Sequence, residues 1–73
     1  MAALTEPFCA LASVTVHNND AVNAQLLDGG YTIPASSSLV IDFTALSVYA
    51  RTRQAIACNN ADAGGVVVIT AHS

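Results

Sequence analysis

The sequence predicts an all-β fold, a small six-stranded β-sandwich or open barrel with one short helical turn near residues 44–47. Three observations predict it. Apolar and polar residues alternate in several short segments, turn-forming Gly, Asn and Pro residues separate these segments at near-regular spacing, and 73 residues hold one domain at most. We expect residues 1–7 to form an N-terminal arm, residues 8–71 the single β domain, and residues 72–73 a short C-terminal tail.

The first half of the chain supplies four of the six strands. In the first, Val14 and Val16 alternate with Thr15 and His17, which is the period of a half-buried strand. The Asp28-Gly29-Gly30 segment favours a hairpin turn, because glycine adopts positive φ without steric cost. The four strands are expected at residues 11–17, 22–27, 31–33 and 38–43, with Thr44 as the N-cap of the helical turn that follows.

The segment at residues 48–58 is ambiguous. As a helix it would gather Leu46, Tyr49 and Ile56 on one face, but Arg53 interrupts that face. As a strand it alternates regularly. We favour a fifth strand, because the surroundings are β-like and residues 59–65 have the composition of a hairpin loop.

The last strand, residues 66–70, is apolar on both of its faces. Such a strand lies either in the centre of a sheet covered twice or with one face against another subunit. A chain of 73 residues has few layers with which to cover both faces. We therefore expect Val67 and Ile69 to lie in an interface, together with Phe8 at the start of the domain.

The composition favours association with other protein surfaces. Hydrophobic residues make up 53% and charged residues 10% of the chain, whereas soluble domains have about 25% charged residues. Large exposed apolar patches on such a chain would tend to associate. We therefore expect a homo-oligomer, or burial of the surface in a larger assembly.

Arg51 and Arg53 are the only basic residues. On a strand, a spacing of two places both on the same face. A guanidinium binds carboxylates through two parallel hydrogen bonds, and arginine is enriched at interfaces. The two side chains are therefore either solvated or an interfacial pair that faces carboxylates on a neighbour, and we include both among the expected interface residues.

Several classes of function are disfavoured. Two arginines and a net charge of −3 are too little positive charge for nucleic-acid binding. The sequence contains no run of 18 apolar residues, the length that would cross a membrane. The residues before Pro7 lack the basic start of a signal peptide. No cofactor, metal site or catalytic constellation is indicated, because His17 and His72 have no converging partners, and aromatic residues are few. We therefore expect a protein that is not an enzyme.

Cys9 and Cys58 lie far apart in the sequence. They are either two reduced, buried thiols that pack as small apolar residues, or a single disulfide that ties the first strand to the fifth. A thiol-dependent enzyme would need one of them to be reactive.

Two segments carry a resemblance. Val14-Thr15-Val16-His17-Asn18, followed by Ile33-Pro34-Ala35-Ser36-Ser37-Ser38-Leu39-Val40, has the form V-T-V-x-N and then I-P-A-x-S-x-x-V. This form resembles small β-sandwich virion proteins of tailed bacteriophages, among them capsid decoration (cement) proteins and short head–tail or fibre modules. The resemblance covers about half of the chain, and Ser36 stands where such proteins often have glycine.

The resemblance implies a structural role. It assigns no functional residue of those proteins to a position in this chain. The expected function is a virion protein, assembled in the host cytoplasm, that decorates or cements a capsid as a homo-oligomer by contacting the major capsid protein or another virion protein. The alternative is an adhesion module that binds a carbohydrate or a receptor through the polar loops at residues 17–20, 35–38 and 59–63.

Overall fold

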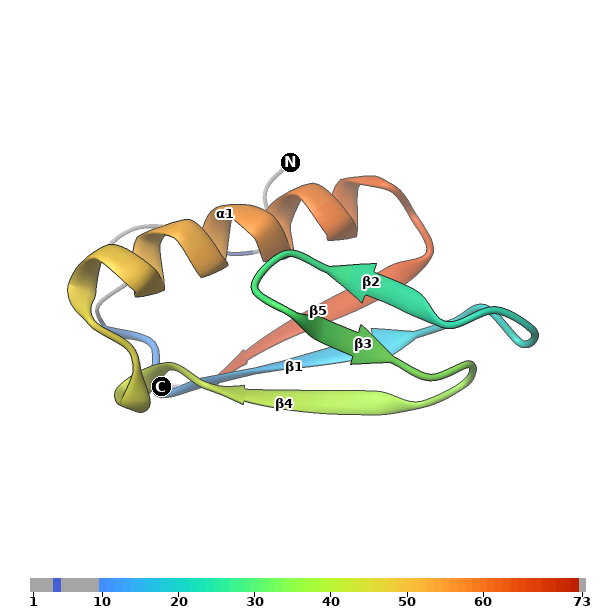
Figure 1. The fold of residues 1–73 in the computed structure, drawn as a ribbon, viewed down its shortest axis with the longest axis horizontal. Coiled ribbons are helices and arrows are strands. Elements are labelled where there is room, and N and C mark those ends of the chain that lie inside the picture. The colour runs from blue at the N-terminus through green and yellow to red at the C-terminus, as the bar shows by residue number, and fades with distance from the viewer. Residues whose placement is uncertain (1–3, 5–9, 73) are drawn as a thin grey trace.

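The computed structural model describes Leu4 and residues 10–72, in which five strands and one α-helix are arranged as Figure 1 shows. The elements are, in chain order, β1 (Ser13–Asn18), β2 (Gln25–Leu27), β3 (Tyr31–Ile33), β4 (Ser38–Asp42), the 3₁₀ turn η2 (Phe43–Ala45), α1 (Val48–Ala63) and β5 (Val67–His72).

The strands form two antiparallel sheets. The larger has the order β4-β1-β5, and the smaller is the β2–β3 hairpin. In the larger sheet, Val14 of β1 is paired with Ile41 on one side and with Ala71 on the other. The chain is therefore a small β-rich fold with two antiparallel sheets and one helix. The expected all-β class and the count of six strands hold only approximately.

The core lies between one face of the three-stranded sheet and the layer formed by α1 and the hairpin (Figure 1). Val14 and Val16 face this core from β1, as their alternation with polar residues predicts. Leu4, which the sequence assigned to an arm, is buried in the same core and bonded through its backbone to the Asn59 side chain. His72, expected in a tail, is the last residue of β5.

The strand predicted at residues 48–58 is wrong, because α1 runs through it and through most of the predicted hairpin loop. The Ser47 hydroxyl caps the helix by accepting a hydrogen bond from Ala50 N at 3.2 Å. Thr44, predicted as the N-cap of the short helical turn, lies inside η2, and Asp42 is its N-cap. The residues that α1 buries are small or polar: Gln54, Ala55, Ala57 and Cys58. Without large apolar residues the buried face gives no clear helical period, and alanine supplies the helix propensity instead.

Asn18 ends β1 and holds the loops at that end of the molecule. Its side chain is completely buried. Its Nδ2 atom lies within hydrogen-bonding distance of the carbonyls of Asn23 (3.0 Å), Ile33 (3.0 Å) and Pro34 (3.2 Å), and its Oδ1 accepts from Asp20 N at 2.8 Å. The residue therefore links β1 to both ends of the hairpin.

Candidate functional site

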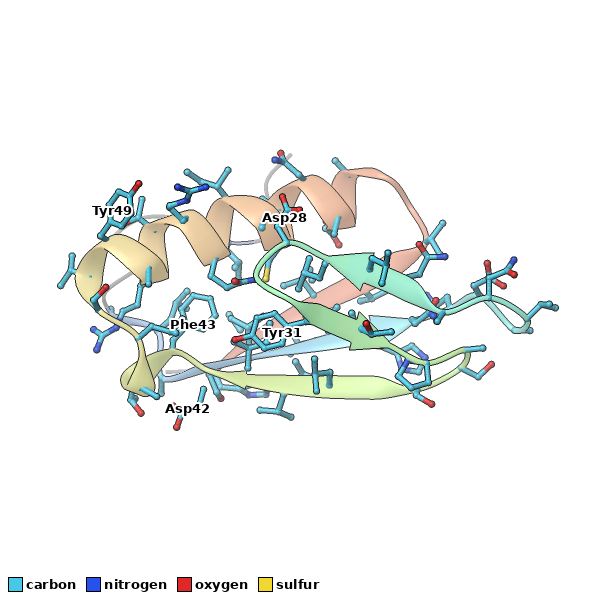
Figure 2. The ribbon with its side chains drawn as sticks, in the orientation of Figure 1. Asp28, Tyr31, Asp42, Phe43 and Tyr49 are labelled. Carbon is cyan, nitrogen blue, oxygen red and sulfur yellow. The ribbon has the colours of Figure 1, made fainter. Side chains whose placement is uncertain are left out.

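A hollow of about 440 Å³ lies between the outer face of α1 and the turn of the β2–β3 hairpin. We call it the α1 hollow. Its main side chains are Tyr49, Arg53, Ile56 and Asn60 from the helix and Asp28 from the turn. Figure 2 shows Tyr49 near the start of α1, with Asp28 on the turn that reaches the middle of the helix. The volume falls within the range of ligand and anchor pockets in proteins.

Helical spacing builds one wall of the α1 hollow. Tyr49, Arg53, Ile56 and Asn60 are separated by three or four residues, so they lie along one face of α1. Tyr49 is 70% exposed and Ile56 is 50% exposed. Of these four residues only Arg53 is among the predicted interface residues, because the helical alternative that groups Tyr49 and Ile56 with it is not the one that the sequence favours.

A close contact between the hairpin turn and α1 forms the other wall. Gln54 donates from Nε2 to the carbonyl of Asp28 at 3.0 Å. Gly29 adopts a φ of 100° beside it, and a Cβ at this position would collide with Oε1 of Gln54. Glycine therefore suits the left-handed turn, and any Cβ at this position would also have to displace the Gln54 side chain.

Arg53 presents a fixed positive charge at this wall. Its Nη1 donates to the Tyr49 hydroxyl at 3.1 Å, and its guanidinium carbon lies 5.7 Å from the centroid of the Tyr49 ring. This stacking is a cation–π contact. The hydrogen bond that Arg53 donates to the Tyr49 hydroxyl, aided by the charge interaction with Tyr49 and by the more distant Asp28 carboxylate, raises the pKa of Arg53 above its ordinary value. The guanidinium is thus oriented by its own helix.

Arg51 has a different role, which corrects the expected interfacial pair. Its Nε donates to the carbonyls of Phe43 at 2.7 Å and Leu46 at 3.0 Å, and Nη2 lies 3.5 Å from the carbonyl of Thr44. Residues two positions apart on a helix are separated by about 200° around its axis, so Arg51 and Arg53 point in nearly opposite directions. Arg51 therefore holds η2 against the start of α1.

The other predicted site residues have separate locations. Val67 is 5% exposed and belongs to the core, so its side chain faces the inside of its own fold and not a neighbour. Ile69 is half-buried against the same core. Phe8 and Cys9 lie outside the described residues.

Cys58 is a free thiol in the core, and Cys9, its partner in the alternative disulfide, lies outside the described residues. Burial raises the pKa of Cys58 to about 11, and a hydrogen bond with Gln54 opposes part of this rise. The thiolate, which is the nucleophilic form, is therefore scarce at neutral pH.

The second face of the three-stranded sheet is not covered by other elements of the described chain. We call it the open face; it carries Ser13, Thr15, His17, Ser38, Val40, Asp42, Val68, Thr70 and His72. Val40 is 61% and Val68 47% exposed. Both histidines form hydrogen bonds within the open face. His17 Nδ1 is bonded to Ser38 Oγ at 2.7 Å, and His72 Nε2 to Thr15 Oγ1 at 2.9 Å. Val40 and Val68 are not among the predicted interface residues, although the sequence shows residues 66–70 to be apolar on both faces.

Within Leu4 and residues 10–72, no three His, Cys, Asp or Glu side chains gather as ligands for a metal ion. None of the helices in this part of the chain has the length and apolar character needed to span a bilayer. The chain matches no protein-family model, and no curated protein or solved structure is significantly similar to it.

Proposed function

We propose that this chain is a structural, non-catalytic virion protein that decorates or cements a capsid as a homo-oligomer, in contact with the major capsid protein or another virion protein. One observation carries the proposal: large apolar side chains are exposed on a chain that has only two basic and five acidic residues. Water solvates such a surface poorly, so a covering protein surface stabilises it. The exposed side chains are Val22, Leu26, Val40, Val48, Tyr49, Ile56, Val66 and Val68.

The α1 hollow is the proposed anchor for the shell protein. Tyrosine and arginine are the residue types that dominate binding energy at protein interfaces, and Tyr49 and Arg53 stand side by side here. Ile56 supplies an apolar contact next to them. We infer that the hollow takes an acidic side chain of the shell protein, since the planar guanidinium of Arg53 binds a carboxylate through two hydrogen bonds.

The backbone at Ser36 is compatible with the resemblance to phage virion proteins. Ser36 has a φ of 55°, in the left-handed region that favours glycine. It occupies the position at which the resembled proteins often have glycine. A virion location, reached after assembly in the host cytoplasm, follows from this proposal.

Co-sedimentation with purified shells tests the proposal. We expect the wild-type chain to co-sediment, and Arg53→Gln to weaken binding by at least about tenfold, as loss of an interface anchor does. Ala24→Glu is the matched control, because it changes the net charge by the same amount at an exposed position outside the hollow. A wild-type chain that never co-sediments with shells would refute the capsid role.

The geometry of the α1 hollow also favours a second candidate, a carbohydrate-binding adhesion module. The exposed ring of Tyr49 lies beside the polar side chains of Asp28, Arg53 and Asn60, and ligand sites combine such a ring with a few polar groups. Asn60 belongs to α1 and not to the polar loop expected at residues 59–63. A glycan array with the wild-type chain and Tyr49→Ala decides this candidate: binding that Tyr49→Ala abolishes supports it, and an array without hits eliminates it.

A further inference from the structure

β5 is an edge strand of the larger sheet, and its outer side is unpaired within the described residues. Asn19 N donates to Val66 O at 3.0 Å. Hydrogen-bonded pairs alternate along an antiparallel ladder, so Val68 and Thr70 also bond toward β1. The backbone N–H and C=O groups of Val67, Ile69 and Ala71 therefore point away from the sheet.

This edge lacks the features by which proteins usually protect exposed strands. Between Val66 and Ala71 there is no charged residue and no proline, whereas natural edges commonly carry Lys, Pro or a bulge. The other edge strand, β4, is one residue shorter and ends at the charged Asp42. All four aspartates lie outside β5, so a second copy of this strand would meet no like charge along it.

We propose that β5 pairs in antiparallel orientation with β5 of a second copy of this chain, which makes one continuous six-stranded sheet. The inference deepens the proposed function, since it rests on the homo-oligomer proposed there and names its seam. It does not depend on the capsid as partner.

The pairing is self-complementary. Centred on Ile69, it places Ile69 opposite Ile69 of the partner subunit and Val67 opposite Ala71 of the partner subunit, so every outward backbone group along this stretch finds a partner. The symmetry is a closed two-fold with its axis perpendicular to the sheet. Both open faces therefore lie on the same side, with Val68 and Thr70 at the seam, and both copies of α1 lie on the other side.

An apolar groove lies at the start of β5, between this strand, the β2–β3 hairpin and the end of α1. It has a volume of about 220 Å³ and is lined in part by Leu26, Leu27, Val66 and Val67. Leu26 is 82% exposed. In the paired dimer, Ala71 of the partner subunit comes next to Val67 in the floor of this groove, so each copy gains an apolar contact at each end of the seam.

Light scattering over a range of concentrations tests the pairing. A single strand pair buries less surface than a standard interface, so we expect a concentration-dependent dimer. Ala71→Pro removes an outward N–H and leaves the bonds to β1 intact, so it should yield a monomer with an unchanged circular dichroism spectrum. Ala71→Ser keeps the N–H and should remain dimeric.

A second pair of variants keeps the test decisive if Ala71→Pro does not fold. Thr70→Lys places a charge at the seam and should give a monomer, whereas Thr32→Lys places the same charge on an exposed position of β3 and should not. A chain that stays monomeric at all concentrations, or a dimer that survives both Ala71→Pro and Thr70→Lys, overturns the inference. Co-sedimentation of Thr70→Lys with shells separates loss of the dimer from failure of the capsid role.

Discussion

Replacement of Asn18 by alanine is the sharpest test of how this small fold is held together. The side chain is completely buried and satisfies four backbone groups, three carbonyls and the amide of Asp20. Alanine leaves these groups without their partner and leaves a cavity in their place. The three carbonyls belong to the two ends of the β2–β3 hairpin, so the variant removes the hydrogen bonds that join the hairpin to β1.

The expected loss of stability follows from these contacts. A hydrogen bond contributes about 1 kcal/mol net, and a buried group left unpaired costs about 1–3 kcal/mol. Nδ2 has two hydrogens for its three acceptors, so we expect a loss of about 2–4 kcal/mol in the free energy of unfolding. A domain of this size has about 4–11 kcal/mol in total. At about 4–8 °C per kcal/mol, the melting temperature should fall by roughly 8–32 °C.

Urea and thermal denaturation followed by circular dichroism measure the effect. The control is Asn19→Ala, because Asn19 is exposed and its side chain bonds to no group in the described part of the chain. Asn18→Asp is nearly isosteric but points a carboxylate at three carbonyl oxygens, so it should destabilise at least as much at neutral pH and less in acid. An Asn18→Ala variant within about 0.5 kcal/mol of Asn19→Ala would refute the reasoning, since that is the scatter of neutral surface changes.

Three further predictions concern separate features. Gly30→Ala should cost about 1–2 kcal/mol from its positive φ alone, and Gly29→Ala more, because its Cβ also meets an α1 side chain; equal losses in urea denaturation would contradict this. In a Cys9→Ser background, Cys58 should react slowly with iodoacetamide at neutral pH and rapidly in urea, because burial raises its pKa to about 11; rapid native alkylation would show a reactive thiol. Hydrogen bonds from the backbone of Asn23 and Val22 lower the pKa of Asp20 below 3.8, so its stabilisation is present above that value and is lost as the pH falls through the folded pKa; Asp20→Asn should therefore flatten the acid side of the stability–pH curve.

The strands could be predicted because their sequences contain local signals. Val14 and Val16 alternate with polar residues, and Asp28-Gly29-Gly30 specifies the hairpin turn, whose glycines have positive φ. These features depend on neighbours within a few residues. Strand pairing was not accessible in the same way, because the order β4-β1-β5 joins segments from the two ends of the chain through tertiary contacts.

The helix was missed for a physical reason. Its buried positions hold Ala55, Ala57 and Cys58, which are small enough for α1 to lie close to the sheet but too small to produce an apolar stripe. Asn59 and Asn60 resemble a loop in sequence, yet both lie within α1, where the Asn59 side chain hydrogen-bonds the backbone of Leu4. The signals that favour the helix are the cap at its start and its alanine content, and both are weaker than the period of two that the segment also shows.

The assignment of residues 48–58 to a strand also led to the wrong pairing of site residues, because the period assigned to a segment determines which side chains lie on the same face. A strand would place Arg51 and Arg53 together on one surface, and a charge reversal of both would then test a single interface. On α1 the two guanidinium groups separate: Arg51 donates to carbonyls of Phe43 and Leu46, and Arg53 stacks on Tyr49 at the hollow. Arg51→Gln should therefore lower stability without a specific effect on docking, whereas Arg53→Gln should weaken docking in a chain of unchanged stability. A docking surface on this protein thus has one oriented guanidinium with which to select an acidic partner, and the apolar side chains around it supply the contact area.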